Sequence, residues 1–94
     1  MLADREISEI VKAGVGEVLP SAKILRVNVQ DNIDSADEQP SLAIVVIFSK
    51  RPTLRGEDFL SLHEAIQERL IDAGEARYPF LRYVGEKELR GAVS

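Results

Sequence analysis

The residues best suited to bind a ligand lie in one short basic segment near the middle of the chain. Lys50, Arg51 and Arg55 fall within a few positions of one another, directly before Gly56 and a predicted helix. Free N–H groups and the positive dipole end of a helix N-terminus favour an anion, so the segment indicates a phosphate or nucleic-acid backbone. The spacing matches no phosphate-loop motif, and the acidic residues 57–58 oppose an anion. A solvated loop paired with these acids is the simpler interpretation.

A second group of charged residues occupies a polar connection between two predicted strands. Carboxylate oxygens are the ligands that hard divalent cations prefer. The spacing lacks the alternating ligands and central glycine of an EF-hand loop, so we interpret the segment as a solvated turn. A divalent-metal or enzymatic site remains the alternative. The carboxylates are Asp31, Asp34, Asp37 and Glu38.

His63 is the only histidine, and the chain has no cysteine. Helical periodicity places it on the flank of an apolar stripe, one turn from Phe59. A general base needs an orienting partner and a substrate-facing cleft, and the sequence indicates neither. One histidine without cysteine is also a poor set of metal ligands. We therefore predict no enzyme activity, no catalytic residue, no resident metal and no cofactor, and interpret His63 as a structural or interface residue.

Aromatic residues and arginines alternate near the C-terminus, where Tyr78, Phe80 and Tyr83 interleave with Arg77 and Arg82. Aromatic side chains on a sheet can stack bases while arginines hold phosphates. The net charge of −4 disfavours binding to a polyanion. The preferred interpretation places Tyr78 and Phe80 in the core, and Tyr83 with Arg82 at an edge or interface.

Hydrophobic periodicity predicts five elements in the order α-β-β-α-β. Gly14 lies inside the apolar stripe of the first helix, where it would let a neighbouring backbone come close. Alternation along the first strand predicts that Leu25 faces the core and that Ile24 lies on the polar side. Residues 1–85 are expected to form one domain, and residues 86–94 a polar tail with a frayed helical turn and then disorder. The predicted helices span 4–19 and 57–73, and the predicted strands span 23–30, 42–48 and 77–84.

These elements predict an α+β fold, a two-layer α/β sandwich with both helices on one face of a three-stranded, mainly antiparallel sheet. The preferred spatial order places the first strand centrally, in a split β-α-β arrangement. The alternative order, 1-2-3, places the second strand centrally, beside a parallel third strand. The element order resembles half-ferredoxin-like modules, such as the cytoplasmic regulatory domain of cation-efflux transporters, and that resemblance implies dimerisation through the sheet. The metal-binding histidines of those domains have no counterpart here beyond His63.

The second predicted strand is apolar on both faces, because Leu42 to Phe48 is an unbroken run of seven apolar residues. Two helices suffice to cover only one face of the sheet. The sequence therefore favours a non-enzymatic protein-interaction or regulatory module that self-associates through its sheet as a homodimer, or that binds another protein. Nucleic-acid or anion binding at the basic loop is the alternative. The proposed interface residues are Ile24, Val45, Ile47 and Tyr83.

Composition sets the remaining expectations. The chain has 94 residues, of which 45% are hydrophobic and 30% charged, as in ordinary globular domains. The longest apolar run is far shorter than a membrane span, and the N-terminus lacks the apolar core of a signal peptide. Together with the lack of cysteine, this predicts a cytoplasmic protein that does not enter a membrane.

Overall fold

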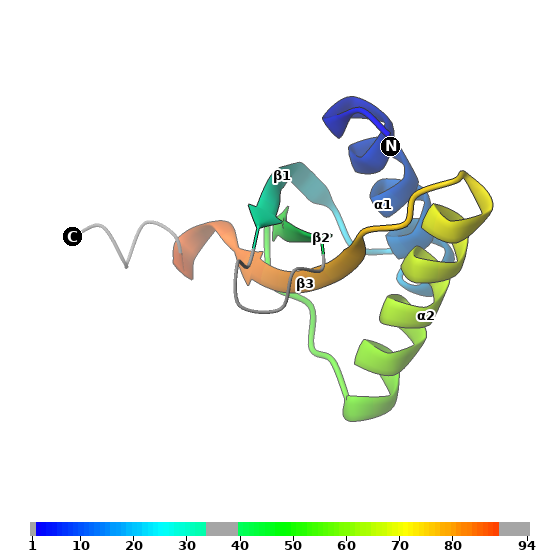
Figure 1. Ribbon diagram of the computed structural model, residues 1–94. Helices are drawn as coiled ribbons and strands as arrows, with labels where there is room; N and C mark the ends of the chain where they lie inside the picture. Colours follow the sequence, from blue (N-terminus) through cyan, green and yellow to red (C-terminus); the bar gives the residue numbers. More distant parts are fainter. Residues whose placement is uncertain (1, 34–39, 89–94) are drawn as a thin grey trace.

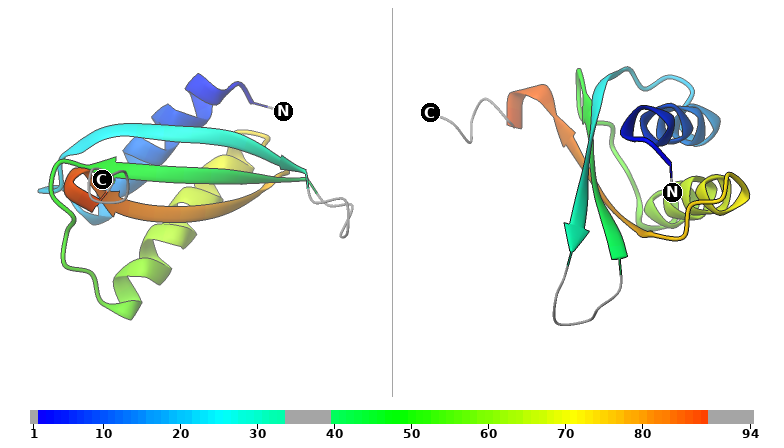
Figure 2. Two further views of the ribbon diagram at one scale, coloured as in Figure 1. Left: turned by 90° about the vertical axis from the view of Figure 1, so that its left-hand side faces the viewer. Right: turned by 45° about the horizontal axis from the view of Figure 1, so that its top comes forward.

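The structure is a computed structural model that describes residues 2–33 and 40–88. Two helices pack on the same face of a three-stranded sheet (Figures 1 and 2). The α-β-β-α-β order and the α+β class predicted from the sequence are confirmed. The elements are α1 (Asp4–Val18), β1 (Ile24–Ile33), β2 (Pro40–Phe48), α2 (Gly56–Asp72) and β3 (Tyr78–Gly85).

The sheet order is β1-β2-β3, with β1 antiparallel and β3 parallel to β2. The preferred prediction, with the first strand in the middle and a split β-α-β unit, is therefore wrong, and the alternative order is correct. The sheet is mixed rather than mainly antiparallel. The physical reason lies in the strands themselves. A strand that is apolar on both faces is best buried between two neighbours, whereas β1, with one polar face, tolerates an edge.

The register of β1 shifts near its start. Ile24 pairs with Phe48, but Arg26 pairs with Ile47, so Leu25 is an extra residue in the strand. Such a bulge changes the face to which the preceding side chain points. Ile24 consequently packs against the core, and Leu25 is 43% exposed. The predicted placement of Ile24 on the polar face, with Leu25 on the buried one, is thus wrong.

The face assignment of β3 is also the reverse of the prediction. Tyr83 pairs with Val46 and belongs to the core between sheet and helices, whereas Tyr78 and Phe80 are 45% and 55% exposed. The strand alternates as expected, but both sets of alternating residues are apolar or aromatic. Periodicity alone therefore does not reveal which set faces the helices.

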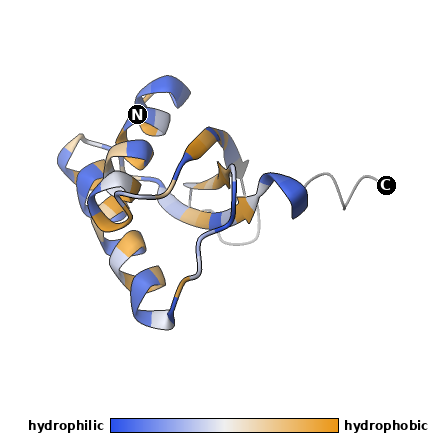
Figure 3. Ribbon diagram, turned by 180° about the vertical axis from the view of Figure 1, so that it is seen from behind, coloured by the Kyte–Doolittle hydropathy of each residue, from blue (hydrophilic) through white to orange (hydrophobic). Residues whose placement is uncertain are grey.

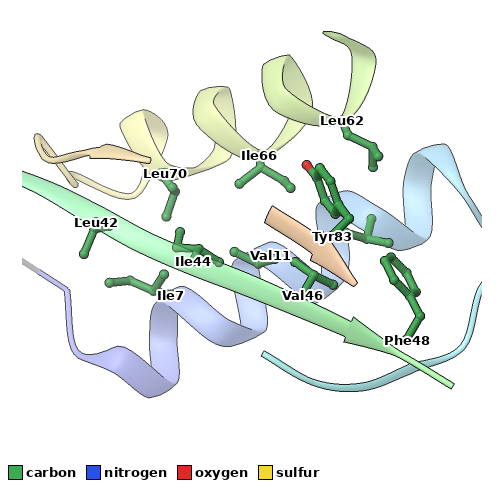
Figure 4. Packing of buried hydrophobic residues seen from close by; sticks show 11 residues of the cluster. Ile7, Val11, Leu42, Ile44, Val46, Phe48, Leu62, Ile66, Leu70 and Tyr83 are labelled. Carbon is green, nitrogen blue, oxygen red and sulfur yellow. The ribbon is translucent and has the colours of Figure 1, made fainter. Parts of the chain in front are cut away.

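The core lies in a single layer between the helices and β2 (Figure 4). Hydrophobic and hydrophilic residues recur along both helices (Figure 3), so each helix has a hydrophobic stripe that faces the sheet. The buried cluster consists of Ile7, Val11 and Val15 of α1, Leu62, Ile66 and Leu70 of α2, Leu42, Ile44, Val46 and Phe48 of β2, and Tyr83 of β3.

Gly14 is a point at which the two helices come close together. A Cβ atom at this position would lie 2.8 Å from Cγ1 of Ile66 and 3.5 Å from its Cα. The missing side chain therefore permits the close approach that the sequence indicated. A Cβ atom at Gly16, two residues further along α1, would meet no neighbouring atom within 4 Å.

Gly14→Ala should lower the free energy of unfolding by about 1–3 kcal/mol, because overpacking against Ile66 outweighs the gain in helix propensity. Gly16→Ala is the matched control and should raise it by up to ~1 kcal/mol. Urea denaturation at pH 7 measures both. Equal stabilisation by the two alanines would show that Gly14 does not set the distance between the helices.

Candidate interaction surfaces

Neither α1 nor α2 covers the opposite face of the sheet, and among the described residues only a short helical turn at 86–88 lies on that side (Figure 2). We call this surface the outer face. Side chains alternate along each strand, and the register therefore defines its members. They are Arg26, Asn28 and Gln30 from β1, Ser41, Ala43, Val45 and Ile47 from β2, and Tyr78, Phe80, Arg82 and Val84 from β3.

The outer face has an unusual chemistry for this chain. The sequence has 16 acidic residues and a net charge of −4, yet none of the outer-face residues is a carboxylate and two are arginines. Its centre is apolar and only partly buried at Val45, and Phe80 is more than half exposed. The surface therefore combines apolar, aromatic and cationic groups, which is typical of an interface.

Of the four interface residues suggested by the sequence, Val45 is partly exposed on the outer face. Ile47 points to the same face but is only 2% exposed. At this end of the sheet the chain continues from β3 into a helical turn over residues 86–88, which lies on the outer side (Figure 2). Ile24 and Tyr83 pack on the opposite, helix-covered side.

An aromatic cluster lies along the edge formed by β3. The rings of Tyr78 and Phe80 are 5.0 Å apart, and the His63 ring is 5.6 Å from that of Tyr78. Nε2 of His63 lies 3.2 Å from the Tyr78 hydroxyl, within hydrogen-bond distance. His63 therefore has a phenol rather than a carboxylate as its neighbour. This pair lacks the carboxylate that commonly orients a histidine base.

Of the four carboxylates in the acidic connection, Asp34, Asp37 and Glu38 lie outside the described residues. Asp31 belongs to β1 and binds Arg77. Within the part of the chain that the structure describes, no three His, Asp or Glu side chains gather closely enough to hold a metal ion.

Arg55 of the basic loop lies in a different environment from Lys50 and Arg51. The backbone N–H of Arg55 donates to Asp58 at 2.9 Å, and its side chain lies 4.0 Å from Glu57. Arg55 is thus engaged at the start of α2. Lys50 and Arg51 instead line a hollow of about 510 Å³ together with Lys23, which lies far from them in sequence. We call this surface the basic hollow.

Arg77 is not available to bind nucleic acid, because it belongs to a buried ion pair with Glu75. Their side chains are 4% and 1% exposed. Nε and Nη2 of Arg77 donate to the two carboxylate oxygens of Glu75, at 3.0 and 2.7 Å. This bidentate geometry is the strongest form of such a pair. Arg82, by contrast, is exposed on the outer face.

The pair also joins segments that are distant in sequence. Arg77 donates to the backbone oxygen of Leu2 at 3.0 Å and to the carboxylate of Asp31, while the Leu2 N–H donates to Glu75 at 3.1 Å. The hydrogen bonds from Arg77 lower the pKa of Glu75 to about 2. The hydrogen bonds to Glu75 raise the pKa of Arg77. Sequence analysis missed this cluster, because a Glu and an Arg two residues apart are common on protein surfaces.

Tyr83 carries a buried hydroxyl group for which the described residues offer no hydrogen-bond partner. Its ring lies near those of Phe48 and Phe59, at centroid distances of 6.4 and 5.8 Å. Figure 4 shows the hydroxyl pointing toward α2. Burial raises the pKa of Tyr83 to about 12, since the charged form would lose its hydration.

Comparisons with models of protein families, with curated proteins and with solved structures give no match for this chain. Neither of the two helices has the length and apolar character that crossing a membrane requires. The class of protein defined here is a small α+β domain with a mixed three-stranded sheet.

Glu75→Gln should lower the free energy of unfolding at pH 7 by about 3 kcal/mol, because it leaves Arg77 buried without its main counter-charge. The ordinary pKa of this carboxyl is 4.5, and the fold lowers it to about 2. The wild type should therefore lose stability as pH falls from about 5 to 2, and the variant should lose less. Urea denaturation across this range measures the slope.

Glu9→Gln is the control for that experiment, because Glu9 forms only an exposed pair with Lys12 at 4.0 Å. It should change stability at pH 7 by well under ~1 kcal/mol. A Glu75→Gln slope as steep as that of the wild type would show that the acid sensitivity arises elsewhere.

Tyr83→Phe should leave stability at pH 7 unchanged or raise it by about 1 kcal/mol, because it removes a buried hydroxyl without a partner. Tyrosine ionises near pH 10 in the unfolded chain and at about 12 here, so the wild type should lose stability between these values. The variant should lose less over that range. A loss of about 1 kcal/mol or more at pH 7 would reveal a hydrogen bond to the hydroxyl.

Proposed function

We propose that this protein is a non-enzymatic interaction module that self-associates through the outer face of its sheet. One observation carries the proposal. The central strand β2 is apolar on both faces, and the helices cover only one of them. A partly exposed Val45 and an exposed Phe80 on the other face gain from burial in an interface.

A second copy of the chain is the occupant that the register favours. Three outer-face rows run across the sheet: Gln30–Ala43–Phe80, Asn28–Val45–Arg82 and Arg26–Ile47–Val84. Two such sheets pack with their strands roughly aligned. A two-fold axis parallel to β2 then brings β1 of one copy over β3 of the other.

This arrangement is self-complementary. Ala43 and Val45 meet their own counterparts, while each β1 amide side chain lies over a β3 residue of the other copy in the same row. Amide groups therefore meet an aromatic ring and a guanidinium group, whereas Ile47 and Val84 of the third row are already buried within each copy. A two-fold axis that lies in the plane of the sheet, perpendicular to the strands and level with Val45, is the other possibility. It would place Arg82 of one copy over Arg82 of the other. Like charges facing each other are destabilising, so charge selects the parallel axis.

The size of the outer face predicts a weak dimer. Three strands at the usual spacing give a face on the order of 400 Å² per copy, about half of what a standard stable interface buries. We expect a dimer that dissociates on dilution in the micromolar range. A regulatory module that assembles at high local concentration has such a property.

Val45→Asp and Phe80→Asp should each shift the wild type from a concentration-dependent dimer to a monomer, because each buries an unpaired charge at the centre of the interface. Light scattering on a sizing column, with sedimentation at several concentrations, measures the mass. Leu60→Asp is the matched control, because Leu60 is an exposed apolar residue of α2, outside the outer face. It should leave the dimer intact. Ile47→Asp is unsuitable, because burial of Ile47 makes that variant prone to unfold.

Circular dichroism should show all three variants folded. A wild type that stays monomeric at high micromolar concentration would overturn the proposal. A monomer whose outer face binds single-stranded RNA, with affinity falling steeply as salt rises, would assign the surface to nucleic acid instead.

A further inference from the structure

We propose that the basic hollow binds the phosphate group of a soluble, nucleotide-sized phosphate ester. The hollow lies at the end of the sheet where β1 begins and β2 ends, because its lining includes residues 18–23, before β1, and residues 49–53, after β2. No residue of the outer face lines it. The site is therefore separate from the proposed dimer interface, and its test does not depend on self-association.

Positive charge dominates the lining. Lys23 lies in the turn after α1, and Lys50 and Arg51 lie in the loop after β2. The lining residues that the structure describes include no carboxylate, although the whole chain is acidic. Among the described residues, neither Lys23 nor Lys50 forms an ion pair. Two unpaired ammonium groups beside a guanidinium group create a local field that attracts a multiply charged anion.

Hydroxyl groups supplement these cations. Ser21, Ser49 and Thr53 line the same hollow. Hydroxyls donate hydrogen bonds to phosphate oxygens and impose little charge of their own. A phosphate has several acceptor oxygens, so a mixture of cations and neutral donors suits it better than it suits a carboxylate.

The rest of the lining is apolar and indicates what the phosphate is attached to. Leu19, Pro20 and Pro52 contribute a surface without hydrogen-bonding side chains. The hollow has a volume of about 510 Å³ and is open to solvent on one side. A flat, weakly polar ring joined to a phosphate, as in a mononucleotide, would occupy both parts.

Backbone contacts hold the two sides of the hollow together. The Ser49 N–H donates to the Lys23 oxygen at 3.0 Å. A Cβ atom at Gly85 would lie 3.0 Å from the Arg51 nitrogen, so the loop packs directly on the end of β3. The backbone on either side of the hollow is thus tied to the ends of the strands at Lys23, Ser49 and Arg51.

Arg51 contacts Glu88, with Nη1 of Arg51 3.3 Å from the carboxylate. Both side chains are about half exposed, and exposed pairs of this kind are weak. A phosphate can therefore displace Glu88 from Arg51. Glu88 acts as an internal competitor for the site, so its removal should strengthen binding.

Titration of the whole chain with AMP, adenosine and inorganic phosphate tests the proposal, with amide NMR shifts of Lys23, Ser49 and Lys50 as the readout. AMP should bind and adenosine should not. Lys23→Gln and Lys50→Gln should each weaken AMP binding about tenfold, which is the effect of losing one charged hydrogen bond. Glu88→Gln should tighten binding. Affinity should fall as salt rises from about 50 to 200 mM.

Lys12→Gln is the matched control, because Lys12 lies on α1 outside the hollow and faces Glu9. It should leave AMP binding unchanged. Equal binding of inorganic phosphate and AMP would assign the hollow to the free ion and overturn the role of the apolar lining. No shift of these amides with millimolar AMP or phosphate would overturn the proposal. So would lysine variants that bind normally but unfold more easily, since the lysines would then serve only the stability of the fold.

Discussion

The buried pair of Glu75 and Arg77 is the constraint on which the arrangement of this protein depends. A charge inside a small core is tolerated only when it is paired and fully hydrogen-bonded. Here that requirement joins the connection between α2 and β3 to the N-terminal segment at Leu2 and to β1 at Asp31. Because Asp31 lies on the far edge strand, the pair ties both edges of the sheet to the same point. Ion pairs and hydrogen bonds therefore stabilise one end of the molecule, and apolar packing stabilises the helix-covered face.

The surfaces that remain for function follow from the small number of elements. Two helices cover one face of a three-stranded sheet, and no third layer is present among the described residues. Among the described residues, the strands contribute no carboxylate to the outer face, and two lysines without an ion pair lie at one end of the sheet. Charge is thus segregated by surface: an apolar, weakly cationic face suits another protein copy, and a cationic hollow suits a small anion.

Several features are readable in the sequence because they depend on neighbouring residues. The helical stripes, the doubly apolar strand and the close approach at Gly14 each follow from local spacing, and so does the position of Val45. Periodicity places Ile24 and Tyr83 on the wrong face. A single extra residue in β1 moves Ile24, and both alternating sets of β3 residues are suitable for a core.

The sequence by itself determined which segments are helices and strands, and that β2 needs cover on both sides. Only the tertiary structure decided the strand order, the phase of β3, and the partners of its charged groups. Arg77 meets Asp31 across 46 positions, and Lys23 lies beside Lys50 because the ends of β1 and β2 are hydrogen-bonded. Local propensity acts over a few residues, whereas these pairings depend on how complete elements pack. Local sequence left Arg77 as a less favoured nucleic-acid candidate and Lys50 in a solvated loop, whereas packing buries Arg77 and brings Lys50 and Lys23 to one hollow.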